Sequence, residues 1–153
     1  MRRLLCLLLV SLLVLTPARA QEEKDPVKIT ADLFVVDETS KVATFTGKVV
    51  VIRKDLTVWA PKVVVDYGEE GPSSIKSFVA SGGVRIKTKD QDATGDRAIY
   101  DPTGQTLRVT GNVMVINASS TVGGPDLLID LNANTTTFTG GKGGRVTGVF
   151  TPQ

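Results

Sequence analysis

A seven-residue pattern occurs four times along the chain at nearly constant spacing, and it restricts the possible folds more than any other feature. Each copy is an apolar run that ends in an aspartate, at Asp37, Asp66, Asp101 and Asp130, which are 29, 35 and 29 residues apart. A second series places glycine at Gly47, Gly82, Gly111 and Gly140, spaced by 35, 29 and 29 residues. Both series contain one insertion of six residues, around residues 68–74. A repeat of roughly 20–50 residues indicates a stack of similar units, each unable to bury its apolar face alone.

The local pattern within each repeat is typical of β-strands. Apolar and polar residues alternate with period two through each glycine, as in residues 43–51, 78–86 and 107–115. Such alternation, rich in β-branched and aromatic residues, predicts half-buried strands. No window longer than about 11 residues after residue 20 has a helical period. We therefore expect an all-β fold, a long curled sheet or jelly-roll made of stacked two-strand repeats of 29 residues.

The alternation also predicts which side chains face the interior. The residues assigned to inward faces are Val27, Ile29, Phe34, Val36, Phe45, Val49, Trp59, Val63, Val65, Phe78, Ile86, Tyr100, Leu107, Val109 and Val113. Two interpretations of this set remain open. The aromatic members could be ordinary core residues of a filled β-sandwich, or they could line an apolar trough in a sheet that does not close.

The first and last strands of such a stack would expose unpaired backbone at its two ends. Edges of this kind pair readily with another chain. The candidate residues for end-to-end assembly are Val27, Lys28, Ile29 and Thr30 at one end, and Val146, Thr147, Val149 and Phe150 at the other.

Residues 1–20 have the features of a secretory signal peptide. A basic start is followed by an apolar run too short to span a bilayer, and small residues at Ala18 and Ala20 fit cleavage after Ala20. We expect an exported, periplasmic chain with a single domain over residues 21–153. Loss of three arginines with the signal changes the net charge from +2 to −1, so the composition does not indicate a nucleic-acid partner.

Residue types exclude several kinds of catalytic site. The chain has no histidine, and its one cysteine, Cys6, is in the signal segment. Ser-His-Asp and Cys-His sites and zinc sites with His or Cys ligands are therefore excluded, and no cofactor or metal is expected. The recurring aspartates could suggest calcium, but each follows an apolar strand, so we interpret them as turn residues. The glycine-rich residues 140–144 lack the order of a phosphate-binding loop.

Several segments resemble the OstA-like, LptA-type family of periplasmic lipopolysaccharide-transport proteins. The resemblance rests on residues 26–32, 41–51, 59–67, 93–101, 107–115 and the segment GKGGRVTGVFTP near the end, and it covers nearly all of 21–153. Pro61 departs from the family pattern, which usually has Asp there. The resemblance implies a twisted, V-shaped β-jellyroll that holds lipopolysaccharide acyl chains. It also implies end-to-end joining between an inner-membrane extraction complex and an outer-membrane translocon.

Three functions are therefore compared. The first is a lipid-carrying bridge, and the second is a structural adaptor of the same export pathway with a filled core. The third, an enzyme acting on polysaccharide, is the weakest because no paired carboxylates stand at matching inward positions.

Overall fold

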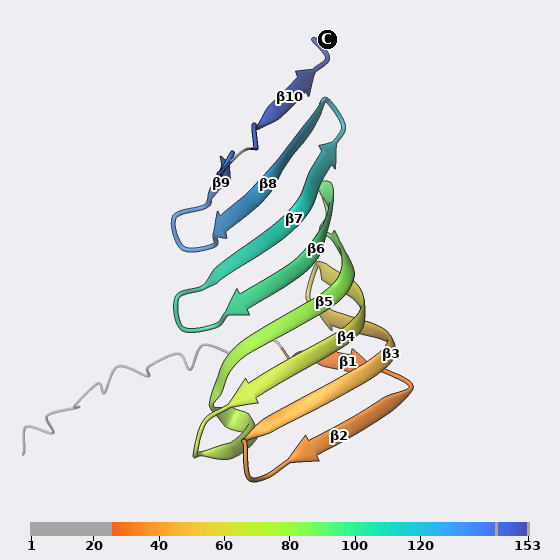
Figure 1. Ribbon diagram of the computed structural model, residues 1–153, viewed down its shortest axis with the longest axis vertical. Helices are drawn as coiled ribbons and strands as arrows, with labels where there is room; N and C mark the ends of the chain where they lie inside the picture. The colour runs from red at the N-terminus through yellow and green to blue at the C-terminus, as the bar shows by residue number, and fades with distance from the viewer. Residues whose placement is uncertain (1–25, 143, 153) are drawn as a thin grey trace, which may run out of the picture.

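The computed structural model describes residues 26–142 and 144–152, so the predicted signal peptide lies outside the described residues. The described chain forms one antiparallel sheet of ten strands (Figure 1). The strands are β1 (Lys28–Thr30), β2 (Leu33–Asp37), β3 (Val42–Arg53), β4 (Leu56–Tyr67), β5 (Ile75–Lys87), β6 (Gln91–Asp101), β7 (Thr106–Asn117), β8 (Ser120–Asp130), β9 (Thr135–Thr139) and β10 (Thr147–Phe150). The predicted all-β class is confirmed. No helix in this part of the chain is long and apolar enough to cross a membrane.

The topology is a meander with a divided strand at each end. Strands β3 to β8 pair in chain order. At one end, β2 pairs with the first half of β3 and β1 with the second half. At the other end, β9 and β10 pair with the two halves of β8 in the same way. Each edge of the sheet is therefore made of two short strands. The two edges lie at opposite ends of the stack (Figure 1).

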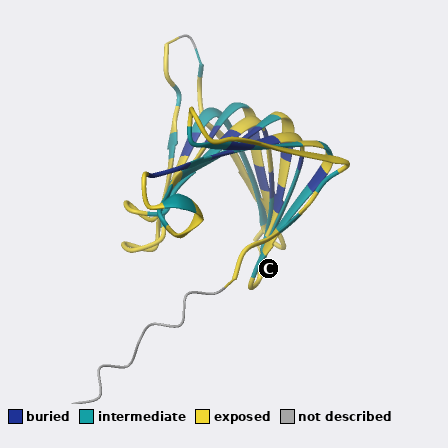
Figure 2. Cartoon of the chain, turned by 90° about the horizontal axis from the view of Figure 1, so that it is seen from below, coloured by how far each residue is buried: buried dark blue, intermediate teal, exposed yellow. Residues whose placement is uncertain are grey.

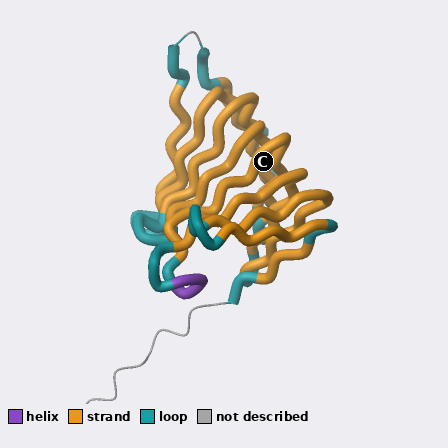
Figure 3. The backbone as a smooth tube through the Cα atoms, turned by 60° about the horizontal axis from the view of Figure 1, so that its bottom comes forward, coloured by secondary structure: helices purple, strands orange, loops and turns teal. Residues whose placement is uncertain are grey.

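Every long strand bends at the same level, and the bend divides the sheet into two wings. Wing A holds residues 33–37, 42–46, 62–67, 75–81, 97–101, 106–110, 126–130 and 135–139, and wing B holds residues 28–30, 49–53, 56–60, 84–87, 91–95, 113–117, 120–124 and 147–150. Seen from below, the strands curve into an arch (Figure 2), and the tube view shows the bends aligned from strand to strand (Figure 3).

The bends are β-bulges on alternate strands. The register shifts between Thr46 and Val49 of β3, and equivalent shifts occur in β5 and β7. Two successive residues with positive φ lie at each bulge: Gly47 and Lys48 (83° and 45°), Gly82 and Gly83 (92° and 96°), Gly111 and Asn112 (76° and 48°). An extra residue on one strand bends it and increases its twist, which explains why the repeated glycine recurs at a fixed interval.

The bulges also decide which residues face inward. On β3, β5 and β7 the two bulge residues preserve the alternation, as the sequence predicts. On β4 the inward face passes from Val58 and Ala60 to Val63 and Val65, so the parity changes at Pro61. The same change occurs on β6 between Ala93 and Ala98.

The core is densest at the bend. The largest fully buried side chains are Val49, Val63, Val109 and Leu127. Each is two residues from a bend residue, namely Gly47, Pro61, Gly111 or Pro125. Burial decreases along both wings away from the bend, so the sheet is packed at its apex and less covered toward the strand ends.

Three of the four repeated aspartates close turns, which confirms their interpretation as turn residues. Asp37 Oδ1 accepts hydrogen bonds from the backbone N–H groups of Thr39 and Ser40, at 2.9 and 3.1 Å. Asp101 and Asp130 accept equivalent bonds two and three residues ahead. Asp66 instead precedes the six-residue insertion, which contains the 3-10 turn η1 (Gly71–Ser73).

Candidate functional site

An apolar trough lies between the two wings. It encloses about 370 Å³ and takes lining residues from both wings. Its lining comprises Val27, Val51, Arg53, Leu56, Val58, Val63, Phe78, Ala80, Ile86, Thr88, Gln91, Ala93, Ala98, Tyr100, Leu107, Val115, Leu127, Ile129, Leu131, Asn134, Thr135 and Thr136. This volume is within the usual range for a small-molecule site, about 300–1,000 Å³.

The structure brings together most of the residues predicted to face inward, in two settings. Six of them line the trough: Val27, Val63, Phe78, Ile86, Tyr100 and Leu107. Another six belong to or pack against the core without lining the trough: Ile29, Phe45, Val49, Val65, Val109 and Val113. Five of the first six, all except Val27, also belong to or pack against this core. The trough therefore lies directly against the packed core and shares residues with it, so the two interpretations of the inward residues apply to overlapping sets of side chains.

Phe34 and Val36 differ from the rest because they lie on the edge strand β2. Phe34 stacks on Phe45 of β3, with ring centroids 4.6 Å apart. Both β2 residues are exposed, and Phe34 retains 55% of its accessible surface. No strand in the described chain covers β2 on its outer side, because β2 pairs with β3 alone. The edge thus presents apolar side chains next to unpaired backbone.

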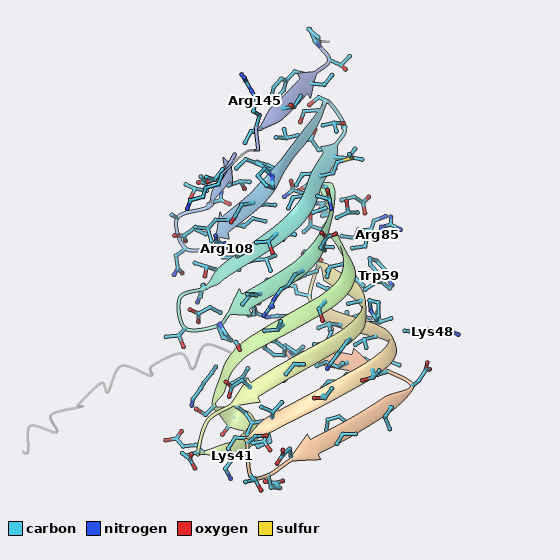
Figure 4. The ribbon with its side chains drawn as sticks, in the orientation of Figure 1. Lys41, Lys48, Trp59, Arg85, Arg108 and Arg145 are labelled. Atoms are coloured by element: carbon cyan, nitrogen blue, oxygen red, sulfur yellow. The ribbon has the colours of Figure 1, made fainter. Side chains whose placement is uncertain are left out.

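The inward assignment of Trp59 is wrong. Trp59 pairs with Val50 and Arg85 on its neighbouring strands, and the Arg85 guanidinium carbon lies 5.4 Å from the centroid of the indole. Its neighbour Val58 lines the trough, and successive residues of a strand point to opposite faces. Figure 4 shows Trp59, Arg85 and Lys48 projecting from the same outer side of the sheet. Strict alternation from Val63 and Val65 would place Trp59 on the inward face, but the alternation changes phase at Pro61.

Sequence reasoning missed the polar residues at the mouth of the trough. Arg53, the last residue of β3, donates a hydrogen bond from Nη1 to the hydroxyl of Tyr100 on β6, at 2.9 Å. The guanidinium carbon is 6.0 Å from the centre of the same ring. Arg53 follows Val49 and Val51 at two-residue intervals, so it lies on the same inward face of β3. That alternation is the sequence signal that identifies Arg53 as a residue of the trough.

The outer face carries ion pairs between neighbouring strands. Arg85 Nη2 is 3.1 Å from Asp92 Oδ1. Arg108 makes a two-pronged contact with Asp126, and its Nε is 3.1 Å from Oδ1. This hydrogen bonding raises the pKa of Arg108. Both arginines are more than half exposed, so these pairs contribute little to stability.

The chemistry of the trough is that of a binding site for apolar groups. Within residues 26–142 and 144–152, no three His, Cys, Asp or Glu side chains are grouped so that they could hold a metal ion. The described core contains no buried charged or polar residue. The lining is mostly apolar, so a long apolar chain could lie in the trough chiefly against apolar side chains.

Comparison with known proteins identifies the family. The family model described as "LptA/(LptD N-terminal domain) LPS transport protein" matches residues 28–135, which include β1 to β8. The chain belongs to this family. The family is one of lipopolysaccharide-transport proteins.

Two individual proteins are similar to this chain, one in structure and one in sequence. LptH from Pseudomonas aeruginosa is described as the LptA-homologous periplasmic component of the lipopolysaccharide-transport device. Its crystal structure matches with a TM-score of 0.73 and 20% identity, over 84% of this chain and 96% of LptH. This likeness confirms the predicted β-jellyroll. The uncharacterised protein R00383 of Rhizobium meliloti (strain 1021) is 28% identical over 103 residues, 63% of this chain and 55% of the relative. The chain thus spans about half the length of that curated relative.

Proposed function

We propose that this protein is a periplasmic bridge that binds lipopolysaccharide and carries it from the inner toward the outer membrane, with the acyl chains shielded in the trough. The observation that carries this proposal is the apolar cavity of about 370 Å³ between the wings, in a chain of the LptA family. LptH, which has the same fold, is described as a component of a lipopolysaccharide-transport device.

Acyl chains suit the trough on energetic grounds. Moving one methylene group from water into an apolar site is worth about 0.8 kcal/mol. Several methylenes therefore give useful affinity without any specific polar contact. Because most side chains of the lining are apolar, an acyl chain could also move along the trough without breaking strong bonds, which is what a carrier requires.

The proposal includes the partners that the family implies. An inner-membrane extraction complex would deliver lipid at one edge of the sheet, and an outer-membrane translocon would receive it at the other. The apolar residues of β2 and β10 remain exposed, with Phe34 at 55% and Phe150 at 71%. Both edges suit pairing with a similar sheet, so head-to-tail self-association is part of the proposal. No catalytic residue is assigned, and export would leave Gln21 as the first residue.

A structural adaptor with a filled interior is the second candidate. It is favoured by the dense apex, where Val49 and Val109 have no accessible surface. The two candidates differ in whether lipid enters the mouth of the trough, farther along the wings.

Photo-crosslinking at two aromatic positions separates them. A benzoylphenylalanine in place of Phe78, which lines the trough, should capture lipopolysaccharide when a working extraction complex is supplied. The same residue in place of Trp59 on the outer face should not. Both sites hold an aromatic ring in the native chain, so the comparison isolates the face of the sheet. Equal capture at both positions, or capture at neither, would refute the carrier and leave the adaptor.

A further inference from the structure

The Arg53–Tyr100 hydrogen bond joins the two wings across the mouth of the trough. Arg53 ends β3 in wing B, whereas Tyr100 lies one residue before the end of β6 in wing A. The two residues are 47 positions apart, and their strands are not neighbours in the sheet. A bond between them therefore spans the trough rather than following the sheet.

Arg53 is distinctive among the residues that line the trough. It is the one charged side chain in that lining. Arg85 and Arg108, on the outer face, each pair with an aspartate. Among the described residues, no carboxylate lies within ion-pair distance of Arg53, and its hydrogen-bond partner is a neutral phenol. Within residues 26–142 and 144–152, its positive charge is thus held over an apolar site without a counter-ion.

We propose that Arg53 is a specificity-determining residue that binds a phosphate-type oxyanion on the polar end of the bound lipid, and that the hydroxyl of Tyr100 competes with this oxyanion for Arg53. The inference rests on the proposed lipid-binding function and adds to it the group that recognises the head. Acyl chains would occupy the apolar lining, and the anionic group would meet Arg53 at the mouth.

The exchange of partners is favourable on chemical grounds. A guanidinium forms two parallel bonds with a phosphate, and such charge-assisted bonds are roughly twice as strong as neutral ones. The phenol of Tyr100 offers a single neutral acceptor. When an oxyanion binds Arg53, it therefore displaces the hydroxyl of Tyr100. The hydrogen bond that connects the wings is then broken, and the acyl chains gain access to the apolar lining beneath that bond.

The proposal predicts a difference between two lipids that share their acyl chains. The probes are lipid A and the same lipid A after enzymatic removal of its phosphates, titrated against the mature protein. For Arg53→Gln, affinity for phosphorylated lipid A should fall by about tenfold or more, as expected for loss of a charge-assisted bond. Affinity for the dephosphorylated lipid should change little.

Two further variants act as controls. Arg85→Gln removes an outer-face positive charge and should leave both affinities unchanged, which tests for a general effect of net charge. Tyr100→Phe keeps the ring but removes the competing acceptor, so phosphorylated lipid A should bind a few-fold more tightly. Thermal unfolding of each variant checks that the fold is intact.

A competition arm distinguishes a lipid head group from free phosphate. Inorganic phosphate at millimolar concentration should displace little lipid A if the chains and the head group bind together, and displacement of all the lipid would overturn the assignment to a lipid head. Equal losses for both lipids in Arg53→Gln, or no loss for either, would overturn the role of Arg53 while leaving the carrier intact. Failure of the wild-type protein to bind either lipid would overturn the proposed function itself.

Discussion

Gly47 and Asp32 meet at the bend, and the contact leaves no room for a side chain on the glycine. The backbone N–H of Asp32 donates to the carbonyl of Gly47 at 3.0 Å. A Cβ atom on Gly47 would lie 2.5 Å from Asp32 Oδ2. Asp32 is the second residue of the first seven-residue copy, and Gly47 is the first member of the glycine series. The two series of the repeat therefore meet at the bend, where the second residue of a copy lies against the repeated glycine.

The same relationship recurs along the sheet. A Cβ on Gly82 would meet Pro61, and one on Gly111 would meet Asp96. At the last copy the relationship differs: a Cβ on Gly140 would meet Gly144 and Arg145, and Pro125 is approached by Gly144 instead. The second position of each copy is thus Asp, Pro, Asp and Pro in turn. Pro61, which departs from the family pattern, occupies this bend position and contacts its glycine as the aspartates do.

The first prediction concerns this contact. Gly111→Ala should destabilise the protein by about 1–3 kcal/mol, because the residue has φ of 76° and its new methyl group would collide with Asp96. Gly123→Ala is the matched control, since a Cβ there makes only an ordinary contact with the carbonyl of Val113, at 3.5 Å. Urea unfolding of both variants measures the difference. Similar stabilities for the two would show that the bend tolerates a side chain.

The sequence predicts the strands correctly, and it predicts the inward residues of the strands that carry a bulge, such as β3. It does not predict the inward residues of the strands between them, such as β4. Period-two alternation passes unbroken through Gly47, so the inward residues of β3 could be assigned from it. On β4, Pro61 faces a bulge that belongs to the neighbouring strand β5, so the parity change has no local signal. The inward orientation that alternation predicts for Trp59 is wrong for that reason.

The site was predictable in its apolar part alone. Alternation places Phe78 and Ile86 inward without knowledge of the partner strand. The Arg53–Tyr100 bond depends instead on how far the sheet curls, since it joins strands that do not pair. The curvature is the combined effect of the bulges on several strands. It therefore cannot be predicted from any short segment of the sequence.

The second prediction concerns end-to-end assembly. Thr151 donates its N–H to the carbonyl of Ser119, the residue before β8, at 2.9 Å, so by alternation the N–H of Phe150 points away from the sheet. Phe150→Pro removes this free donor and should suppress growth of larger species, while the pairing of β10 with β8 remains. Phe150→Ala loses the same ring but retains the donor. Light scattering over a wide concentration range compares them, and equal oligomers for both variants would count against pairing through this edge.

The third prediction concerns pH. The pKa of Asp37 is lowered by hydrogen bonds from Ser40, first from its side chain and then from the backbone, and by one from Thr39. A lowered pKa favours the folded state above the unfolded pKa of about 3.9, and this contribution is lost as pH falls through the folded value. Asp37→Asn should therefore melt slightly below the wild type at pH 7, and the gap should close as the pH falls through the folded pKa of Asp37. A gap that persists in acid would mean that the charge of Asp37 is not its source.

The fourth prediction concerns export. The small residues Ala18 and Ala20 predict cleavage after Ala20. The protein recovered from the periplasm should begin at Gln21, which N-terminal sequencing determines. Ala20→Leu places a bulky residue at the cleavage position and should leave a longer precursor attached to the membrane. Recovery of the wild-type chain with Met1 in place would contradict the interpretation.

The last prediction distinguishes the packed apex from the open trough by two substitutions, one expected to lower mainly stability and the other mainly lipid binding. Val109 has no accessible surface and is not part of the trough lining. Val109→Ala should lower the free energy of unfolding by about 1–3 kcal/mol, because the apex cannot collapse onto the lost methyl groups.

Phe78 lines the trough and is only partly buried. Phe78→Ala should weaken lipid A binding more than Val109→Ala does, since it removes apolar contact area for the acyl chains. Chemical denaturation and lipid titration of both variants give four measurements. If Val109→Ala also weakened lipid binding as strongly as Phe78→Ala, the apex would be part of the binding surface, and the division between packed apex and open trough would not hold.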